Sequence, residues 1–203
     1  GRVCPAPCES ACTRSNFDSA VAIRQLKRFA SDQEMMLVKS GKLTMPDERK
    51  ISPDAKKVAV VGAGPAGLTC AADLADKGFA VTVFETGSRA GGMLVWGIPE
   101  YRLPRDILDY EVELIRRKGV EFKFNFRAGK DASISDLKDK FDAVFVSAGA
   151  HGGRRLGIEG EDLKGVDSGV EFLRENGSSE SKPRVCENVV VIGGGNVAVD
   201  VAR

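Results

Sequence analysis

A glycine-rich turn after an apolar run constrains the fold of this chain more than any other feature. The stretch KVAVVGAGPAGLTCAADLADKGFAVTVFET carries an apolar run at residues 58–61, and Gly62, Gly64 and Gly67 follow directly. Such a continuous run is typical of a parallel strand that is covered on both faces. A helical pattern and a second apolar run ending in Glu85 come next. Together these features form the dinucleotide-binding fingerprint of a Rossmann-like α/β domain.

Each residue type in this turn has a mechanical reason. Gly62 permits the tight turn, Gly64 lets the backbone approach a pyrophosphate, and Gly67 lets the helix pack against the strand. The helix N-terminus offers free N–H groups and a positive dipole end to phosphates. Glu85 can accept hydrogen bonds from ribose hydroxyls. The alternative is a strand–helix turn whose glycines serve packing only.

A second glycine turn lies near the end of the chain, in NVVVIGGGNVAVDVAR. Gly193, Gly195 and Ala198 match the G-x-G-x-x-A variant of the fingerprint, and another apolar run precedes them. We therefore expect a strand at about residues 188–192, a turn and the start of a helix. No second strand ending in an acidic residue follows within the chain, so a turn built for packing alone is a stronger alternative here.

Two such turns favour two dinucleotides, and the economical chemistry is hydride transfer between a nicotinamide and a flavin. This chemistry needs no acid or base from the protein, so we expect no catalytic side chain. The only histidine, His151, is interpreted as a loop residue near the cofactors rather than a base. Asp73 and Asp200, each on a helix after a glycine turn, are interpreted as solvated or capping residues.

The rest of the chain alternates helical and strand-like patterns. Near the N-terminus the spacing predicts a helix over residues 18–29, capped by Asn16 or Asp18. Further elements are expected as a short helix at 32–41, a polar linker at 42–56, a helix at 105–118, a strand at 120–126, a strand within 141–150, a short helix at 168–175 and a polar surface loop at 175–184.

Cys4, Cys8 and Cys12 lie four residues apart in GRVCPAPCESAC. This spacing suits a shared metal centre in a reducing compartment, which we interpret as the cytoplasm, better than a disulfide framework. Iron–sulfur ligation is favoured, because a centre beside a flavin must carry electrons. A zinc site, a leftover disulfide pair and free thiols remain alternatives. Cys70 and Cys186 are interpreted as small core residues.

Charge and hydropathy exclude two classes of partner. The net charge of +1 gives no basic excess for binding nucleic acid. No uninterrupted apolar run approaches the roughly 20 residues that a membrane-spanning helix needs. No secretory signal is visible either.

Several motifs together resemble one known family. The chain is similar to the small (beta) subunit of glutamate synthase, the N-terminal part of dihydropyrimidine dehydrogenase and the large subunit of NADH-dependent ferredoxin:NADP oxidoreductase. The resemblance rests on the cysteine motif, on VAVVGAGPAGLTCA, on FDAVFVSAGAHGGRRLGIEGED and on VVVIGGGNVAVDVAR. The most specific stretch is AGGMLVWGIPEYRLP, because generic needs of the fold do not explain it.

The resemblance implies roles for individual residues. Gly64, Pro65 and Ala66 would lie against the FAD pyrophosphate, and Glu85 would hold the adenosine ribose. Further contacts along FAD would come from Gly92, Met93, Arg102, Ala128, Gly149 and Ala150. The nicotinamide dinucleotide would be received by Gly193, Gly194, Gly195, Asn196 and Val197. From its chemistry alone, Arg102 fits a phosphate fork and a surface ion pair equally well.

The resemblance also implies two [4Fe–4S] clusters in the N-terminal region. There the cysteine motif has four members, and its first cysteine would immediately precede Gly1. We therefore expect Cys4, Cys8 and Cys12 to form an incomplete ligand set. Some relatives use Glu or Gln as a further ligand where this chain has Lys27, with Gln25 two residues earlier. A protonated lysine cannot ligate iron, so this position departs from the pattern.

These expectations combine into one organisation. Residues 1–50 would form a truncated α-helical iron–sulfur segment with a linker, 51–150 an incomplete Rossmann-like FAD domain, and 151–203 the start of a second, NAD(P)H-binding domain. The function would be a flavoprotein oxidoreductase module that passes electrons between NAD(P)H, FAD and iron–sulfur clusters to a larger subunit or a ferredoxin. The alternatives are a non-catalytic electron-relay or assembly subunit and a ferredoxin:NAD(P) oxidoreductase subunit. Alone, these 203 residues are expected to bind FAD poorly and not to turn over.

Overall fold

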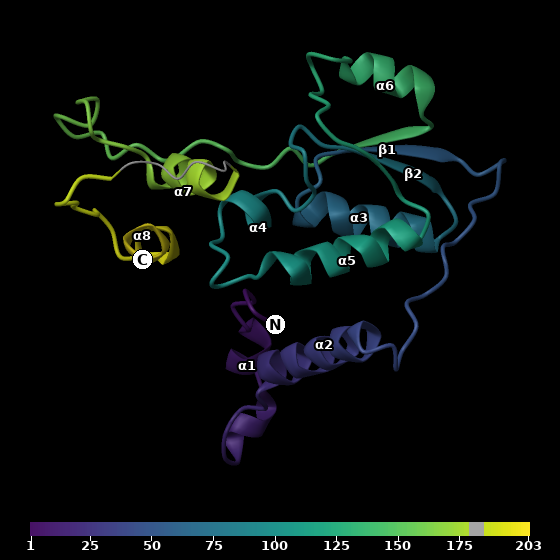
Figure 1. The fold of residues 1–203 in the computed structure, drawn as a ribbon, viewed down its shortest axis with the longest axis horizontal. Helices are drawn as coiled ribbons and strands as arrows, with labels where there is room; N and C mark the ends of the chain where they lie inside the picture. Colours follow the sequence, from purple (N-terminus) through teal and green to yellow (C-terminus); the bar gives the residue numbers. More distant parts are fainter. Residues whose placement is uncertain (179–184) are drawn as a thin grey trace. The chain divides into compact units, whose positions relative to one another are not determined.

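The computed structural model describes residues 1–178 and 185–203, which form two compact units, Gly1–Asp47 and Glu48–Arg203 (Figure 1). The predicted polar loop at 175–184 lies largely outside the described residues, and its first four residues belong to a helix. No helix in the described ranges is long and apolar enough to cross a membrane.

The first unit is helical. It contains α1 (Pro7–Ser10), a 3-10 turn η1 (Thr13–Asn16) and the 17-residue helix α2 (Ile23–Lys39). The prediction of two helices here was wrong, because no glycine or proline interrupts the chain between residues 23 and 39. Arg2 braces this helix by donating from Nη2 to both carboxylate oxygens of Asp32, at 2.9 Å each.

The predicted caps of this helix were also wrong. Ala22 occupies the N-cap position, and the carboxylate of Glu9 accepts the Arg24 N–H at 2.7 Å. A distant side chain therefore satisfies one of the N–H groups that a helix leaves free at its start. Asp18 instead accepts from Arg14, at 2.7 Å from Nε and 2.6 Å from Nη2.

The second unit is built on a parallel sheet of four strands in the order β3-β2-β1-β4. The strands are β1 (Lys57–Val61), β2 (Ala80–Phe84), β3 (Glu121–Lys123) and β4 (Ala143–Val146). The helices of this unit are α3 (Pro65–Asp76), α4 (Met93–Trp96), α5 (Arg105–Arg117), α6 (Ile134–Lys140), α7 (Gly169–Ser178) and α8 (Asn196–Ala202). This arrangement confirms the predicted α/β class.

Different helices cover the two faces of the sheet, with α3 and α5 on one side and α6 on the other (Figure 1). Val60 and Val83 are fully buried toward α3 and α5. Val61 and Phe84, their neighbours in sequence, pack with Leu137 of α6 instead. Successive strand residues point to opposite faces, so a strand covered on both sides must be apolar throughout.

Two predicted strands differ from the structure. β3 ends at Lys123 rather than at residue 126, and Asn125 adopts a left-handed backbone with φ of 56°. The strand expected at 188–192 does not form, and Val190 and Ile192 are 88% and 69% exposed. A strand needs a neighbour for its backbone hydrogen bonds, and no described strand lies beside this segment.

Part of the predicted linker is fastened to the second unit. The Arg49 N–H donates to the carbonyl of Arg117 at 2.7 Å, and the Arg49 guanidinium donates to the carbonyl of Ala75 at 3.1 Å. A cation at the last carbonyls of a helix is favourable, because those groups lack partners within the helix. Arg49 thus joins the ends of α3 and α5 just before the chain enters β1.

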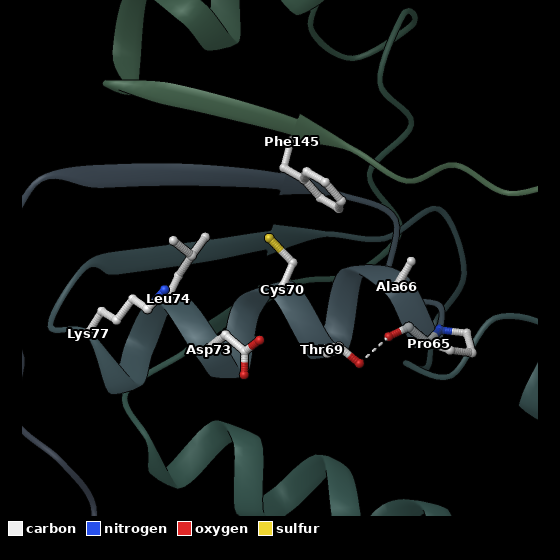
Figure 2. A pocket seen from close by; sticks show the side chains of 8 residues that line it. All are labelled: Pro65, Ala66, Thr69, Cys70, Asp73, Leu74, Lys77 and Phe145. Atoms are coloured by element: carbon white, nitrogen blue, oxygen red, sulfur yellow. Dashed lines mark hydrogen bonds between the residues drawn. The ribbon is translucent and has the colours of Figure 1, made fainter. Parts of the chain in front are cut away.

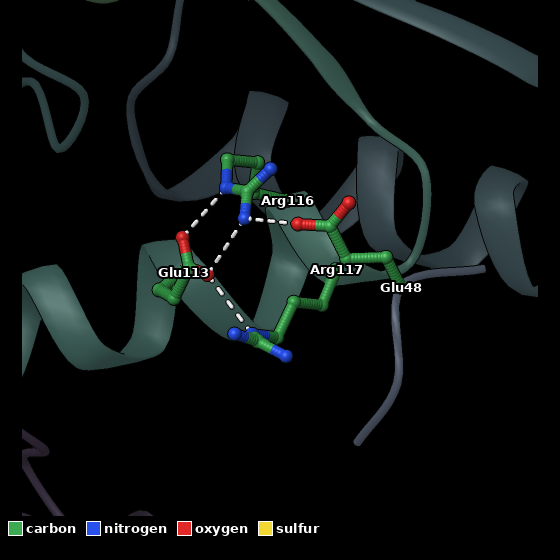
Figure 3. A network of polar contacts seen from close by, with 4 residues as sticks. All are labelled: Glu48, Glu113, Arg116 and Arg117. Carbon is green, nitrogen blue, oxygen red and sulfur yellow. Dashed lines mark hydrogen bonds and ion pairs between the residues drawn. The ribbon is translucent and has the colours of Figure 1, made fainter. Parts of the chain in front are cut away.

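An ion-pair network on α5 continues this attachment (Figure 3). Arg116 donates to Glu48 at 2.5 Å and to Glu113 at 2.7 Å, and Arg117 donates to Glu113 at 2.9 Å. Exposed pairs of this kind each contribute up to about 1 kcal/mol. The network therefore adds little to the free energy of unfolding, and its main effect is to hold Glu48 against α5 before the chain enters β1.

The fold predicts a specific sensitivity at Gly67. A Cβ added there would lie 1.9 Å from the carbonyl oxygen of Gly62 and 2.8 Å from Oγ of Ser147. We expect Gly67→Ala to lower the free energy of unfolding by about 1–3 kcal/mol or more, since backbone atoms would have to move. Urea unfolding of the full-length protein after removal of its flavin measures this, so that differences in FAD binding do not contribute. Gly64→Ala, where an added Cβ meets nothing within 4 Å, is the control. Equal stability of the two variants would contradict the packing role.

Candidate functional site

The first glycine turn lies where the carboxyl ends of the central strands meet. The Gly62 N–H donates to the carbonyl of Phe84 at the end of β2, at 2.8 Å. At the end of β4, the Ser147 N–H donates to the carbonyl of Val61 at 2.8 Å, and Oγ donates to the carbonyl of Gly62 at 3.2 Å. Ligands of open α/β sheets bind at this edge. Ser147 was missed from the sequence, because nothing local ties it to a turn 85 residues earlier.

The glycines of this turn have the geometry expected of them. Gly62 has φ of 102°, which favours glycine, and Gly67 leaves no room for a side chain. Gly64 is the N-cap of the 12-residue helix α3, no side chain caps that helix, and open space lies where its Cβ would be. Pro65 has no N–H, so the free N–H groups at the start of α3 begin with that of Ala66, and their approach is unobstructed. A pyrophosphate fits this cradle.

Glu85, the residue after β2, is hydrogen-bonded to the same turn. One carboxylate oxygen accepts the Ala63 N–H and the other accepts the Gly87 N–H, both at 2.8 Å. A carboxylate has about four lone-pair sites, so both oxygens can accept further hydrogen bonds. The half-buried Glu85 is therefore placed beside the turn with capacity left for ribose hydroxyls.

The segment GGMLVW rests directly on this turn. The Gly91 N–H donates to the carbonyl of Ala63 at 2.8 Å, and a Cβ on Gly92 would lie 2.9 Å from the Cα of Gly64. Gly92 also has φ of 52°. Met93 follows Gly92 in the chain and begins α4, and the contact of both residues with FAD stays a prediction.

The other residues predicted to line FAD come from two different segments. Ala128 forms an isolated bridge with Ala132 and packs half-buried near Phe84. Gly149, with φ of 75°, and Ala150 are exposed just after β4. These positions border the carboxyl edge of the sheet, but the structure does not gather them around Gly64 through any contact of their own.

His151 lies in the loop after β4, as expected. Its Nε2 is 2.7 Å from the carbonyl oxygen of Ala148, and its ring stacks on Trp96 with centroids 5.4 Å apart. Arg174 of α7 donates to the carbonyl of His151 at 2.8 Å and covers the Trp96 ring. This cluster joins α4 to α7.

Arg102 and Asp200 form an ion pair that the sequence did not predict. Arg102 Nη1 donates to the Asp200 carboxylate at 2.5 Å. The interpretation of Asp200 as solvated or capping was wrong, because this residue is only 8% exposed. Asp73, its counterpart on α3, is exposed as predicted.

The second glycine turn has open space beside its second and third glycines. Gly193 has φ of 130°, and a Cβ on Gly194 or Gly195 would meet nothing within 4 Å. Gly195 is the N-cap of α8, whose first residues are Asn196 and Val197. Backbone can therefore approach a ligand here, although the preceding apolar run is not held in a sheet.

The N-terminal cysteines are free thiols, with Cys4 and Cys8 exposed and Cys12 half-buried. The N–H of Val21, followed by that of Arg14, lowers the pKa of Cys12 by hydrogen bonding to its sulfur. The Ala6 N–H lies 3.4 Å from the Cys4 sulfur. Thiolates are the right donors for iron–sulfur centres. Among the described residues, however, no three cysteine, histidine or acidic side chains gather closely enough to hold a metal.

The other two cysteines differ from each other. Cys70 packs half-buried against the α3 side of the core, as predicted, and burial raises the pKa of its thiol. Cys186 was also expected in the core, but it is exposed, because the apolar run that follows it does not enter the sheet.

An open groove lies along α3 where the helix passes Phe145 of β4 (Figure 2). Its volume is about 620 Å³, and Thr69 Oγ1 donates within it to the carbonyl of Pro65 at 2.8 Å. Lining side chains come from Pro65, Ala66, Thr69, Cys70, Asp73, Leu74, Lys77 and Phe145. Only its Pro65 end touches the glycine turn.

A parallel sheet, a glycine turn at a helix N-terminus and an acidic residue after the next strand define a dinucleotide-binding α/β protein. Residues 56–203 match the sequence model of the family described as pyridine nucleotide-disulphide oxidoreductase. The chain therefore belongs to the pyridine nucleotide-disulphide oxidoreductase family. Residues 1–38 match the model of dihydropyrimidine dehydrogenase domain II, 4Fe-4S cluster. These matches imply FAD, NAD(P)H and a 4Fe–4S cluster, which confirms the predicted cofactors at the level of the family.

The whole chain is similar to parts of longer proteins. It is 45% identical to the NADP(+)-dependent formate dehydrogenase subunit beta of Moorella thermoacetica, covering all of this chain and 31% of that protein. It is 39% identical to the glutamate synthase [NADPH] small chain of Bacillus subtilis, covering 98% of this chain and 41% of that protein. The latter match confirms the predicted resemblance.

The fold also matches a solved structure. Mycobacterium tuberculosis FprA, in complex with NADPH, superposes with a TM-score of 0.54 and 26% sequence identity. The match covers 60% of this chain and 28% of that chain. The dinucleotide-binding arrangement is therefore shared with a larger protein that was solved with a nicotinamide dinucleotide.

The geometry of the first turn predicts that Gly64→Ala weakens FAD binding. The added methyl would fill the open space in front of the α3 N-terminus, so we expect at least about a tenfold loss of affinity. Reconstitution of the deflavinated full-length protein with FAD, followed by flavin fluorescence, measures it. Gly78→Ala is the control, since Gly78 also has open space at its Cβ but lies at the far end of α3; because its φ of 88° disfavours alanine, thermal unfolding first establishes that this variant is folded. Unchanged FAD affinity in Gly64→Ala would contradict this placement.

Proposed function

We propose that the chain is a flavoprotein oxidoreductase module that passes electrons between NAD(P)H, FAD and iron–sulfur clusters. The observation that carries the proposal is the open face of Gly64 at the uncapped start of α3, with Glu85 hydrogen-bonded to the same turn. That combination suits a dinucleotide with a pyrophosphate and a ribose. FAD, when bound, supplies a group that takes two electrons from a nicotinamide and releases them singly.

In this proposal the first turn binds the FAD pyrophosphate through backbone N–H groups rather than through cations. Gly64, Pro65 and Ala66 form the cradle, Gly62 and Gly67 hold its shape, and Glu85 accepts the ribose hydroxyls. The rest of FAD would be contacted by Gly92, Met93, Arg102, Ala128, Gly149 and Ala150. The second turn would receive NAD(P)H through Gly193, Gly194, Gly195, Asn196 and Val197.

Residues 51–150 would then be the FAD-binding domain, 151–203 the start of the NAD(P)H-binding domain, and 1–50 the iron–sulfur segment. Cys4, Cys8 and Cys12 would belong to a cluster motif, and the match of residues 1–38 to a 4Fe–4S family supports this. In the part of the chain that the structure describes, the three thiols do not converge on one metal position.

The electron acceptor would be a larger subunit or domain, or a ferredoxin, in the cytoplasm. Support comes from relatives that are named as subunits, such as the NADP(+)-dependent formate dehydrogenase subunit beta, of whose length this chain spans 31%. The five free thiols agree with a reducing compartment.

An anaerobic titration of the full-length protein with NADPH and NADH tests the proposal. We expect bound FAD to lose its absorbance with one of these nicotinamides, followed by an electron paramagnetic resonance signal from reduced iron–sulfur centres. The control reductant is dithionite, which does not need the nicotinamide site. FAD that dithionite bleaches but neither nicotinamide reduces would contradict the proposal and favour a non-catalytic electron relay.

A further inference from the structure

Asp200 is unusual among the charged residues that the structure describes, because it alone is buried. It lies on α8, directly after the second glycine turn, and its side chain is 5% exposed. Its two carboxylate oxygens have separate donors, Nη1 of Arg102 at 2.5 Å and the hydroxyl of Tyr101 at 3.1 Å. A buried carboxylate loses its hydration, so these two donors must replace it.

Both donors come from the segment that rests on the first glycine turn. This segment begins at Gly91, whose N–H donates to the carbonyl of Ala63, and continues with Gly92 against Gly64. Arg105 braces its middle by donating to the carbonyls of Leu94 at 2.7 Å and Ile98 at 3.0 Å. We call residues 91–103 the bridging segment, because one end touches the first turn and the other holds α8.

The bridging segment makes a second attachment to the 151–203 part through α7. Trp96 stacks on His151, and Arg174 covers the same ring with 4.4 Å between its guanidinium carbon and the ring centroid. A Cβ on Gly177 would lie 2.8 Å from the Cα of Trp96, so the two backbones are in close contact. α7 in turn packs on α8, since a Cβ on Gly169 would lie 3.2 Å from the side chain of Val197. The bridging segment is therefore attached at two points, to α7 through Trp96 and to α8 through the ion pair with Asp200.

Only the carboxylate of this ion pair is buried, since the Arg102 side chain is 34% exposed, and the desolvation of that carboxylate offsets much of the Coulomb attraction. Such pairs are better suited to fixing register, since only one arrangement satisfies both partners. Here the ion pair joins two elements. One is α8, which follows the second turn, and the other is the bridging segment, which contacts the first turn.

We propose that Asp200 is a positioning residue, which acts through Arg102 and Tyr101 to fix the second glycine turn relative to the first. It thereby sets the approach of the two dinucleotides without touching either. This inference rests on the proposed function, because it assigns the two turns to FAD and NAD(P)H. Arg102, predicted to line FAD, becomes the residue through which the two sites are linked.

The test uses the FAD-loaded full-length protein and the variants Asp200→Asn and Asp200→Glu. Asn keeps the size of the side chain but removes its charge, whereas Glu keeps the charge. The matched control is Asp73→Asn, an exposed carboxylate on α3, the helix after the first turn. Tyr101→Phe is a milder variant that removes only the 3.1 Å hydrogen bond. FAD content and thermal unfolding establish that each variant is folded.

Three measurements separate positioning from the other roles. In Asp200→Asn we expect hydrogen–deuterium exchange in residues 97–103 and 196–202 to accelerate about tenfold, because the attachment between them is weakened. We expect the rate of flavin reduction at saturating NADPH to fall by about 10- to 100-fold, since misplaced reactants lose orientation. The dissociation constant of NADP⁺ should change less than about threefold, because a positioning residue acts through Arg102 and Tyr101 and not on the ligand. Asp200→Glu should recover part of the rate, and Asp73→Asn should match the wild type.

Two results would overturn the inference. One is a folded Asp200→Asn protein with wild-type exchange and a wild-type saturating rate, which would make the pair merely structural. The other is a weaker NADP⁺ complex with an unchanged saturating rate, which would make Asp200 a ligand-binding group. If the wild type is not reduced by either nicotinamide, the proposed function fails instead. The exchange measurement still decides in that case whether Asp200 holds the two segments together.

Discussion

The contact between Gly67 of α3 and the carbonyl of Gly62 is the constraint on which the rest of the site depends. It lets the helix begin directly at the carboxyl end of β1, so that its free N–H groups face the edge of the sheet. With the helix there, both backbone groups of Ala63 are committed, its N–H to Glu85 and its carbonyl to Gly91. Because Gly67 has no Cβ, α3 can begin at this turn. The turn then holds the phosphate cradle, Glu85 as the ribose acceptor and the start of the bridging segment together.

The first half of the second unit was predictable because its signals are local. An apolar run, three glycines and a helical pattern within residues 57–85 define β1, the turn, α3 and β2 without reference to the remaining chain. The errors at Asp200 and at residues 188–192 occurred where local patterns depend on distant partners. Asp200 is buried by Tyr101 and Arg102, which lie 99 and 98 residues earlier, and no spacing rule connects them. The residues 188–192 have the composition of a strand, yet without a neighbouring strand in the described chain they stay exposed.

The two turns differ in how firmly the structure holds them. The first is hydrogen-bonded to the ends of β2 and β4, whereas the second is attached through α8 and the bridging segment. This difference explains why AGGMLVWGIPEYRLP is the most specific stretch of the sequence. It must fit the backbone of the first turn closely at Gly92 and also present Tyr101 and Arg102 to a carboxylate. Trp96 adds the contact with α7 from the same short stretch.

The central claim is that the first turn is a pyrophosphate cradle made of backbone N–H groups. A crystal structure of the full-length protein with its flavin tests this most directly. The account predicts density for the FAD pyrophosphate within hydrogen-bonding distance of the Ala66 N–H at the start of α3. A flavin bound elsewhere, with Gly64 facing solvent, would contradict it.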